Sequence, residues 1–185
     1  MKGSEQSSFG DNVSVASPVK RYFVKFVLVF SVLQALRLAA LQHDFLILQV
    51  EHLLAWSAGQ FYGLILGPWT LSGNILIHVD VGRFVIVGEP CTGLSLTIGM
   101  MAAIAALPAP VVMRLLAMIA AVVCMQLFNC VRIAHLFYLV LGDREVFEFY
   151  HLYLWQAANM VLMMAVLAMS AWWMKGTHKL ACHAE

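Results

Sequence analysis

The sequence predicts an all-α integral membrane helical bundle of about four to six membrane segments, with a short extracytoplasmic β-hairpin. Of the 185 residues, 62% are hydrophobic and only 11% are charged, whereas a soluble domain carries about 25% charged residues. Several apolar runs are long enough to cross a bilayer as helices. A formal net charge of +1 gives no reason to expect a nucleic-acid partner. The lipid bilayer is therefore the first partner that the composition indicates.

The first apolar run, Tyr22–Leu41, is predicted to span the membrane as a retained signal anchor. Lys20, Arg21 and Lys25 crowd its start, so the positive-inside rule places that end in the cytoplasm. The polar, serine-rich residues before it are typical of a disordered segment. The division that we expect is a disordered cytoplasmic N-terminus at 1–17, a membrane-embedded domain at 18–176 and a short tail at 177–185.

Residues 45–66 have the length of a span, but Glu51, His52, Ser57 and Gln60 interrupt the apolar run. Because charge at the bilayer centre is costly, we interpret this stretch as an amphipathic or re-entrant segment at the outer face. A membrane-crossing helix is the alternative. The first interpretation brings the basic residues that follow later spans to the cytoplasmic side, which fits the positive-inside rule.

Residues 74–88 change character, because β-branched residues alternate with others around a central glycine. This pattern predicts two short strands that form a hairpin. An open hairpin cannot face lipid, since its backbone groups would go unpaired, so we expect it outside the hydrocarbon against the helix ends. The later apolar runs are expected to be helices that cross the membrane: Cys91–Leu107, Val111–Val131 with an extension at Ile133–Leu141, and Tyr150–Met174, the last preceded by a polar loop at 142–148.

The stretch GEPCTGLSLTIGM at 88–100 places polar residues at the mouth of an apolar run. Pro90 suits the first position of a helix, so we expect Cys91 in the first helical turn. Partial positive charge and unpaired N–H groups at a helix N-terminus favour a thiolate. Thr92 and Gly93 let the backbone come close to a substrate. A small buried cysteine at a helix start is the alternative interpretation of Cys91.

Arg132 stands in the stretch LFNCVRIAHLFYL, where almost every neighbour is apolar. An arginine near the membrane edge either snorkels to lipid headgroups or is held by the protein for a purpose. Asn129, Arg132 and His135 are spaced three residues apart, so they share one helical face. We expect this polar stripe to face protein, and snorkelling is the alternative.

His151 opens the last predicted span, among aromatic residues that are typical of a membrane interface. The alternative to an interfacial residue is a general base, because histidine titrates near neutral pH. With Cys91 as nucleophile and Arg132 as the group that stabilises an oxyanion, His151 completes a set for acyl transfer. All three residues are predicted at the outer ends of three different helices.

Other polar residues suggest supporting roles or none. Glu89 could position Arg132 or recognise substrate, although we favour a solvated loop carboxylate. His135 is a rival base that we rank below His151. No cofactor or metal site is predicted, because nothing resembles a CxxC pair or a disulfide framework. The tail residues His178, Cys182 and His183 are interpreted as part of a frayed terminus.

The stretches EPCTGLSL, NCVR and YHLYLWQ resemble, in this order, the three signatures of the exosortase/archaeosortase family of integral membrane proteins. The resemblance covers about residues 70–160. Thr92 stands where serine is usual in the family, and many members carry more spans in front. The short N-terminal half bears on how a substrate docks.

The resemblance implies a cysteine transpeptidase-like enzyme of the cytoplasmic membrane whose site faces the extracytoplasmic side. Its implied partners are membrane-anchored proteins with a C-terminal tripartite sorting signal, made of a short PEP-like motif, a transmembrane helix and a basic cluster. Cys91 is then the nucleophile, Arg132 the oxyanion stabiliser and His151 the acid and base, while Asn129 orients Arg132 or binds substrate backbone. A non-catalytic scaffold of a surface-polysaccharide or export system is the alternative. A transporter is disfavoured, because the spans are too apolar for a polar pathway.

Overall fold

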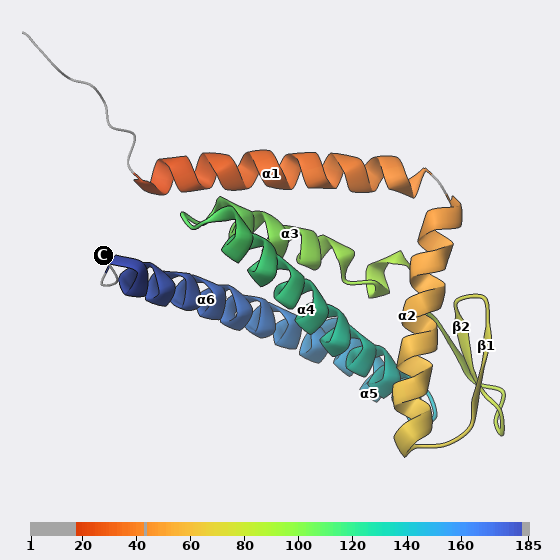
Figure 1. Ribbon diagram of the computed structural model, residues 1–185. Helices are drawn as coiled ribbons and strands as arrows, with labels where there is room; N and C mark the ends of the chain where they lie inside the picture. Colours follow the sequence, from red (N-terminus) through yellow and green to blue (C-terminus); the bar gives the residue numbers. More distant parts are fainter. Residues whose placement is uncertain (1–17, 43, 183–185) are drawn as a thin grey trace, which may run out of the picture.

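A computed structural model describes residues 18–42 and 44–182 (Figure 1). The predictions for residues 1–17 and for His183 lie outside the described residues, as do those for the side chains of His178 and Cys182. The elements in chain order are α1 (Pro18–Leu41), α2 (Asp44–Ile65), β1 (Trp69–Ser72), β2 (Ile75–His78), β3 (Phe84–Ile86), η1 (Glu89–Cys91), α3 (Leu94–Ala106), α4 (Val111–Leu139), α5 (Arg144–Phe149), η2 (Tyr150–Leu154) and α6 (Trp155–Cys182).

Three helical stretches of the described chain are long and apolar enough to cross a membrane: Val19–Ala40, Val111–Leu139 and Arg144–Lys175. In their most apolar windows at most 17% of the residues are buried within the chain, so their side chains are available to lipid. The apolar helix α3 is shorter than these three. The chain is therefore an integral membrane protein built mainly of helices, while the count of about four to six segments stays a prediction.

Helix α2 lies across one end of the bundle that α1, α3, α4 and α6 form (Figure 1). It is not among the three stretches that meet the length and hydropathy expected of a span. If the long helices cross a bilayer, a helix with this orientation lies along the membrane plane. The arrangement therefore favours the amphipathic interpretation of 45–66 over a crossing helix. The face that α2 turns to the protein carries Glu51, which is buried.

The strands form an antiparallel sheet in the order β1-β2-β3, with Trp69 opposite His78 and Ile75 opposite Ile86. The two strands predicted at 74–88 correspond to β2 and β3. The prediction missed a third strand, β1, which lies before that stretch. What holds β1 is the ring of Trp69, which packs on α2. A Cβ atom added at Gly59 or Gly63 would lie 2.6 or 2.7 Å from that ring, so only glycine leaves room for it.

The sheet closes the C-terminal end of α4, where the last carbonyl groups of a helix lack helical partners. His78 is buried and donates from Nε2 to the Phe137 carbonyl at 2.7 Å. Its imidazole also stacks on the phenyl ring of Phe137. Arg83 donates from Nη1 to the Val140 carbonyl at 2.7 Å. The Tyr62 hydroxyl lies 3.2 Å from Nδ1 of His78 and joins α2 to this cluster. Cys91 packs against the same buried core, so the sheet and α2 together fix the end of α4 beside η1.

Candidate active site

Cys91 ends the short 3-10 turn η1 and does not lie in the following α-helix. Its backbone N–H donates to the Gly88 carbonyl at 2.8 Å. Pro90 does stand near the start of this turn, but α3 begins only at Leu94. Thr92 is fully buried, and its hydroxyl donates to the Glu89 carbonyl at 2.7 Å and accepts from the Leu94 N–H at 3.3 Å. Thr92 therefore shapes the turn through its hydroxyl, and the close approach of this backbone to a substrate stays a prediction.

Gly93 separates η1 from α3 with a φ of +66°, a conformation that favours glycine. A Cβ atom here would lie 3.5 Å from Cγ of Asn129, so Gly93 brings the backbone close to α4. Asn129 donates from Nδ2 to the Cys91 carbonyl at 2.8 Å. Its Oδ1 is buried and finds no donor within the described part of the chain. Asn129 thus holds the cysteine turn with one amide atom and leaves the other unpaired.

Arg132 is only 3% exposed, so it does not snorkel to headgroups. Its guanidinium forms no hydrogen bond with any described residue, and Nε is buried without a partner. Its positive charge interacts electrostatically with the Cys91 thiol group and with the His151 imidazole. Burying a charge that lacks acceptors is costly unless a partner arrives. The three residues of the predicted set are therefore brought together around an unpaired guanidinium.

His151 lies in η2, a π-helical turn between α5 and α6. Such turns are rare in proteins, and many of those that occur lie at functional sites. The imidazole is half-buried, and its ring centroid lies 5.6 Å from that of Phe147. It makes no hydrogen bond to the described residues, so both ring nitrogens are available for proton transfer.

His135 sits one helical turn beyond Arg132 and is engaged by aromatic residues. The Trp155 indole N–H donates to Nδ1 of His135 at 3.2 Å, and the Tyr150 ring packs at 5.2 Å. Because Nδ1 accepts this bond, it is unavailable as a base while the bond persists. These contacts agree with ranking His135 below His151.

The transmembrane exosortase family model matches residues 22–173, which is most of the chain. The chain belongs to the transmembrane exosortase family. No curated protein and no solved structure matches it. The match includes every residue of the candidate site in this exosortase-family member, together with α1 and α2, which the motifs alone did not cover.

Glu89 forms an ion pair with Arg37 of α1, and not with Arg132. It is also not the freely solvated loop carboxylate that we favoured, because 68% of its side chain is covered and its partner is 18% exposed. The contact ties the first long helix of this exosortase-family chain to the cysteine turn. Sequence reasoning missed Arg37, although a charge late in an apolar run is a signal for a buried partner.

The arrangement offers a sulfur, a cationic donor and an imidazole, carried by η1, α4 and η2. Helix α2 lies across the end of the bundle at which α4 ends (Figure 1). In the ranges 18–42 and 44–182, no three histidine, cysteine or acidic side chains gather where they could hold a metal ion. The site is thus suited to chemistry that generates negative charge next to Arg132, as the attack of a thiolate on a carbonyl does.

Proposed function

We propose that this exosortase-family member is a membrane-embedded cysteine protease or transpeptidase. It cleaves the C-terminal sorting signals of exported, membrane-anchored proteins through a thioester at Cys91. The single observation that carries the proposal is the buried side chain of Arg132, whose Nε has no acceptor among the described residues and whose charge interacts with both Cys91 and His151. A donor group of this kind is what a tetrahedral oxyanion requires.

In the first step, His151 takes the thiol proton of Cys91, and the thiolate attacks a backbone carbonyl carbon of the substrate. A carbon–sulfur bond forms, and the carbonyl oxygen becomes an oxyanion. Arg132 donates to this oxygen in a site from which water is largely excluded, where such a bond is worth more than in solution. The planar fork of guanidinium donors suits an oxygen that changes its geometry during the reaction.

In the second step, the carbon–nitrogen bond of the substrate breaks, and the imidazolium of His151 gives its proton to the leaving amine. The C-terminal segment departs, and the upstream protein stays on Cys91 as a thioester. An acceptor hydroxyl, amine or water then loses its proton to His151 and attacks the thioester carbon. The carbon–sulfur bond breaks and the thiolate is restored, so the cycle needs no cofactor or redox partner.

Asn129 supports this chemistry as a positioning residue. Its Nδ2 holds the carbonyl of Cys91, and its unpaired Oδ1 lies in the same region as the guanidinium of Arg132, one helical turn away. The free Oδ1 is an acceptor for a backbone N–H of the substrate. On this proposal the site faces the extracytoplasmic side of the cytoplasmic membrane, an orientation that the basic start of α1 supports through the positive-inside rule.

The competing proposal is a non-catalytic scaffold in a surface-polysaccharide or export system. A scaffold has no use for a buried guanidinium without acceptors, because such a group destabilises the fold and offers nothing in return. We therefore prefer the enzyme.

The decisive experiment co-expresses the full chain with an exported reporter that ends in a short motif, an apolar helix and a basic cluster. We expect cleavage of the reporter and a hydroxylamine-sensitive adduct on Cys91, both detected by mass spectrometry. Cys91→Ala should abolish both while the protein stays in the membrane at the normal level. Cys124→Ala is the matched control. Cys124 is a free cysteine of α4 that faces the groove between α4 and α6, away from the site.

Cleavage that persists in Cys91→Ala at the normal rate would remove Cys91 as the nucleophile. A membrane-impermeant thiol reagent, added from outside, checks the orientation independently. It should modify Cys91 in intact cells.

A further inference from the structure

A groove between α2, α3 and α4 leads to the cysteine turn. We propose that it binds the apolar helix of the membrane-anchored substrate. The inference rests on the proposed function and specifies where the substrate is held. It follows from the position of the groove, from the polar groups that line it and from its size.

The groove has a volume of about 590 Å³, and two of its lining residues stand close in sequence to residues of the candidate site. Leu94, at the start of α3, and Cys130, beside Asn129 on α4, both line it. Cys91 packs against the buried core that contains Cys130. The outer rim of the groove is formed by exposed apolar side chains, among them Leu53 on α2 and Leu127 on α4. A chain seated here therefore lies near the cysteine turn.

Each of the three helices also places one polar side chain in this otherwise apolar groove: Ser57, Thr97 and Gln126. Gln126 donates from Nε2 to the Thr97 hydroxyl at 3.2 Å, whereas its Oε1 is buried and receives no bond from the described residues. In membranes, Ser, Thr and Gln side chains hydrogen-bond across helix interfaces. The hydroxyls of Ser57 and Thr97 donate to the Leu53 and Gly93 carbonyls, so the unpaired acceptor in the groove is Oε1 of Gln126. A lipid tail has no donor for this acceptor, whereas a mainly apolar helix that carries a serine or threonine has one, which favours a helix as the occupant.

The size of the groove fits one face of a helix. A helix about 10–12 Å in diameter that rises about 1.5 Å per residue occupies about 120–170 Å³ per residue. A groove of about 590 Å³ can therefore accommodate about one third of the cross-section of a helix along about three of its turns. The remaining surface of the bound helix stays in lipid, which suits an apolar segment that arrives from the bilayer.

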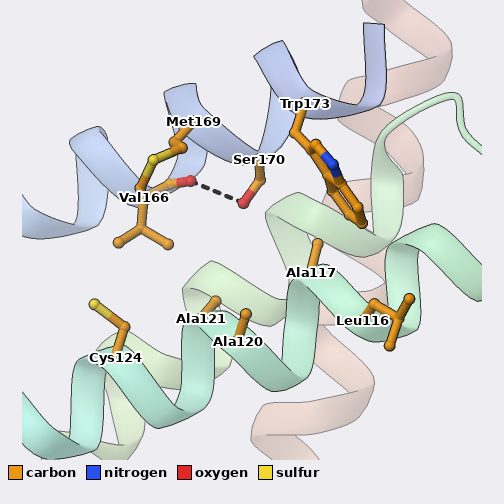
Figure 2. A pocket seen from close by; sticks show the side chains of 9 residues that line it. All are labelled: Leu116, Ala117, Ala120, Ala121, Cys124, Val166, Met169, Ser170 and Trp173. Carbon is orange, nitrogen blue, oxygen red and sulfur yellow. Dashed lines mark hydrogen bonds between the residues drawn. The ribbon is translucent and has the colours of Figure 1, made fainter. Parts of the chain in front are cut away.

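A second groove, of about 440 Å³ between α4 and α6, provides an internal control (Figure 2). Its α4 wall is mostly alanine, and its polar side chain, Ser170, donates to the Val166 carbonyl of its own helix at 2.8 Å. No lining residue of this groove carries a buried polar atom without a partner in the described ranges. Because its polar group is satisfied, this groove is not expected to hold the substrate.

The test places a photoreactive benzoylphenylalanine at Leu127 in the first groove or at Met169 in the second, in the Cys91→Ala chain, with the same reporter as substrate. Both side chains are exposed to a similar degree. In parallel, Val123→Trp fills the first groove and Met169→Trp fills the second, with Cys91 intact. We expect crosslinks to the apolar helix of the reporter from position 127 only. We expect Val123→Trp to lower processing at least tenfold and Met169→Trp to leave it near the normal rate.

Crosslinks from position 127 to lipid alone, or to a second copy of this chain alone, would overturn the inference. So would normal processing by Val123→Trp. Labelling of Cys91 by a thiol reagent shows whether Val123→Trp retains a formed site, and the crosslinks do not depend on that variant. If the wild-type chain does not cleave the reporter, the proposed function fails, yet the crosslink at position 127 still decides whether the groove binds its helix.

Discussion

The two ends of α4 each carry an arginine, and the chain uses them differently. Near the start of the helix, Arg114 donates from Nη1 to the Ala105 carbonyl at 2.9 Å, which satisfies the C-terminal end of α3. Near its other end, Arg132 is buried without an acceptor among the described residues. A cation that completes a helix end has a structural role. A buried cation that completes nothing within the chain indicates a partner from outside.

The two grooves along the same helix repeat this contrast. Ser170 is bonded within its own helix, whereas the carbonyl of Gln126 is left unpaired beside the cysteine turn. Among the described residues, four buried polar atoms without a partner lie toward the cysteine turn: Nε of Arg37, Oε1 of Gln126, Oδ1 of Asn129 and Nε of Arg132. A fifth, Nε of Arg114, lies at the end where α3 meets α4. Unpaired buried polar groups are uncommon in native proteins and need an explanation. Their concentration at one end locates the function there.

The largest effect is expected from replacing each arginine with lysine. Arg132→Lys should lower reporter processing about 100-fold or more, because a single ammonium cannot reproduce the guanidinium donors at the oxyanion. Arg114→Lys should remain close to wild type, since an ammonium can still donate to one carbonyl. Initial cleavage rates at matched membrane levels measure both. Equal losses of cleavage rate in the two variants would contradict the different roles assigned to Arg114 and Arg132.

A smaller effect is expected at the ion pair between Arg37 and Glu89, which ties α1 to the active end. Arg37→Glu and Glu89→Arg should each lower processing about tenfold, because two like charges then face each other near the cysteine turn. The combined exchange should recover most of the rate, since the opposite charges are restored. A double-mutant cycle on the cleavage rate measures this coupling. Losses that simply add would mean that the contact does not position Cys91.

The smallest effect is expected in the grooves. Gln126→Leu should lower processing about two- to fivefold, in line with the modest energies of interhelical hydrogen bonds in membranes. It should change the thermal stability of the free protein little, because the lost hydrogen bond to Thr97 is offset by the removal of a buried carbonyl that lacks a donor. Ser170→Ala should alter neither quantity. A loss of stability in Gln126→Leu without loss of processing would instead make Gln126 a packing residue.

Much of the helical structure could be predicted, because long apolar runs have few alternatives in a bilayer. The proposed chemical residues Cys91, Arg132 and His151 were also visible, since polar residues interrupt those runs at the three places where they stand. The strand β1 was missed because its main support is a ring packed against two glycines of α2, a contact distant in sequence. The hydrogen bonds of the Thr92 hydroxyl within the turn could not be predicted, because nothing local in the sequence reveals them.

By itself, the sequence determined that this chain lies in a membrane and that it carries three separate polar interruptions of exosortase type. Composition and short motifs suffice for this, because burial in lipid depends on each run alone. Only the tertiary structure decided that Glu89 pairs with Arg37, that α2 lies across the end of the bundle, and that Nε of Arg132 has no acceptor in the described part of the chain. These depend on which groups meet in space, and a partner that is absent can be recognised only when every neighbour has been placed.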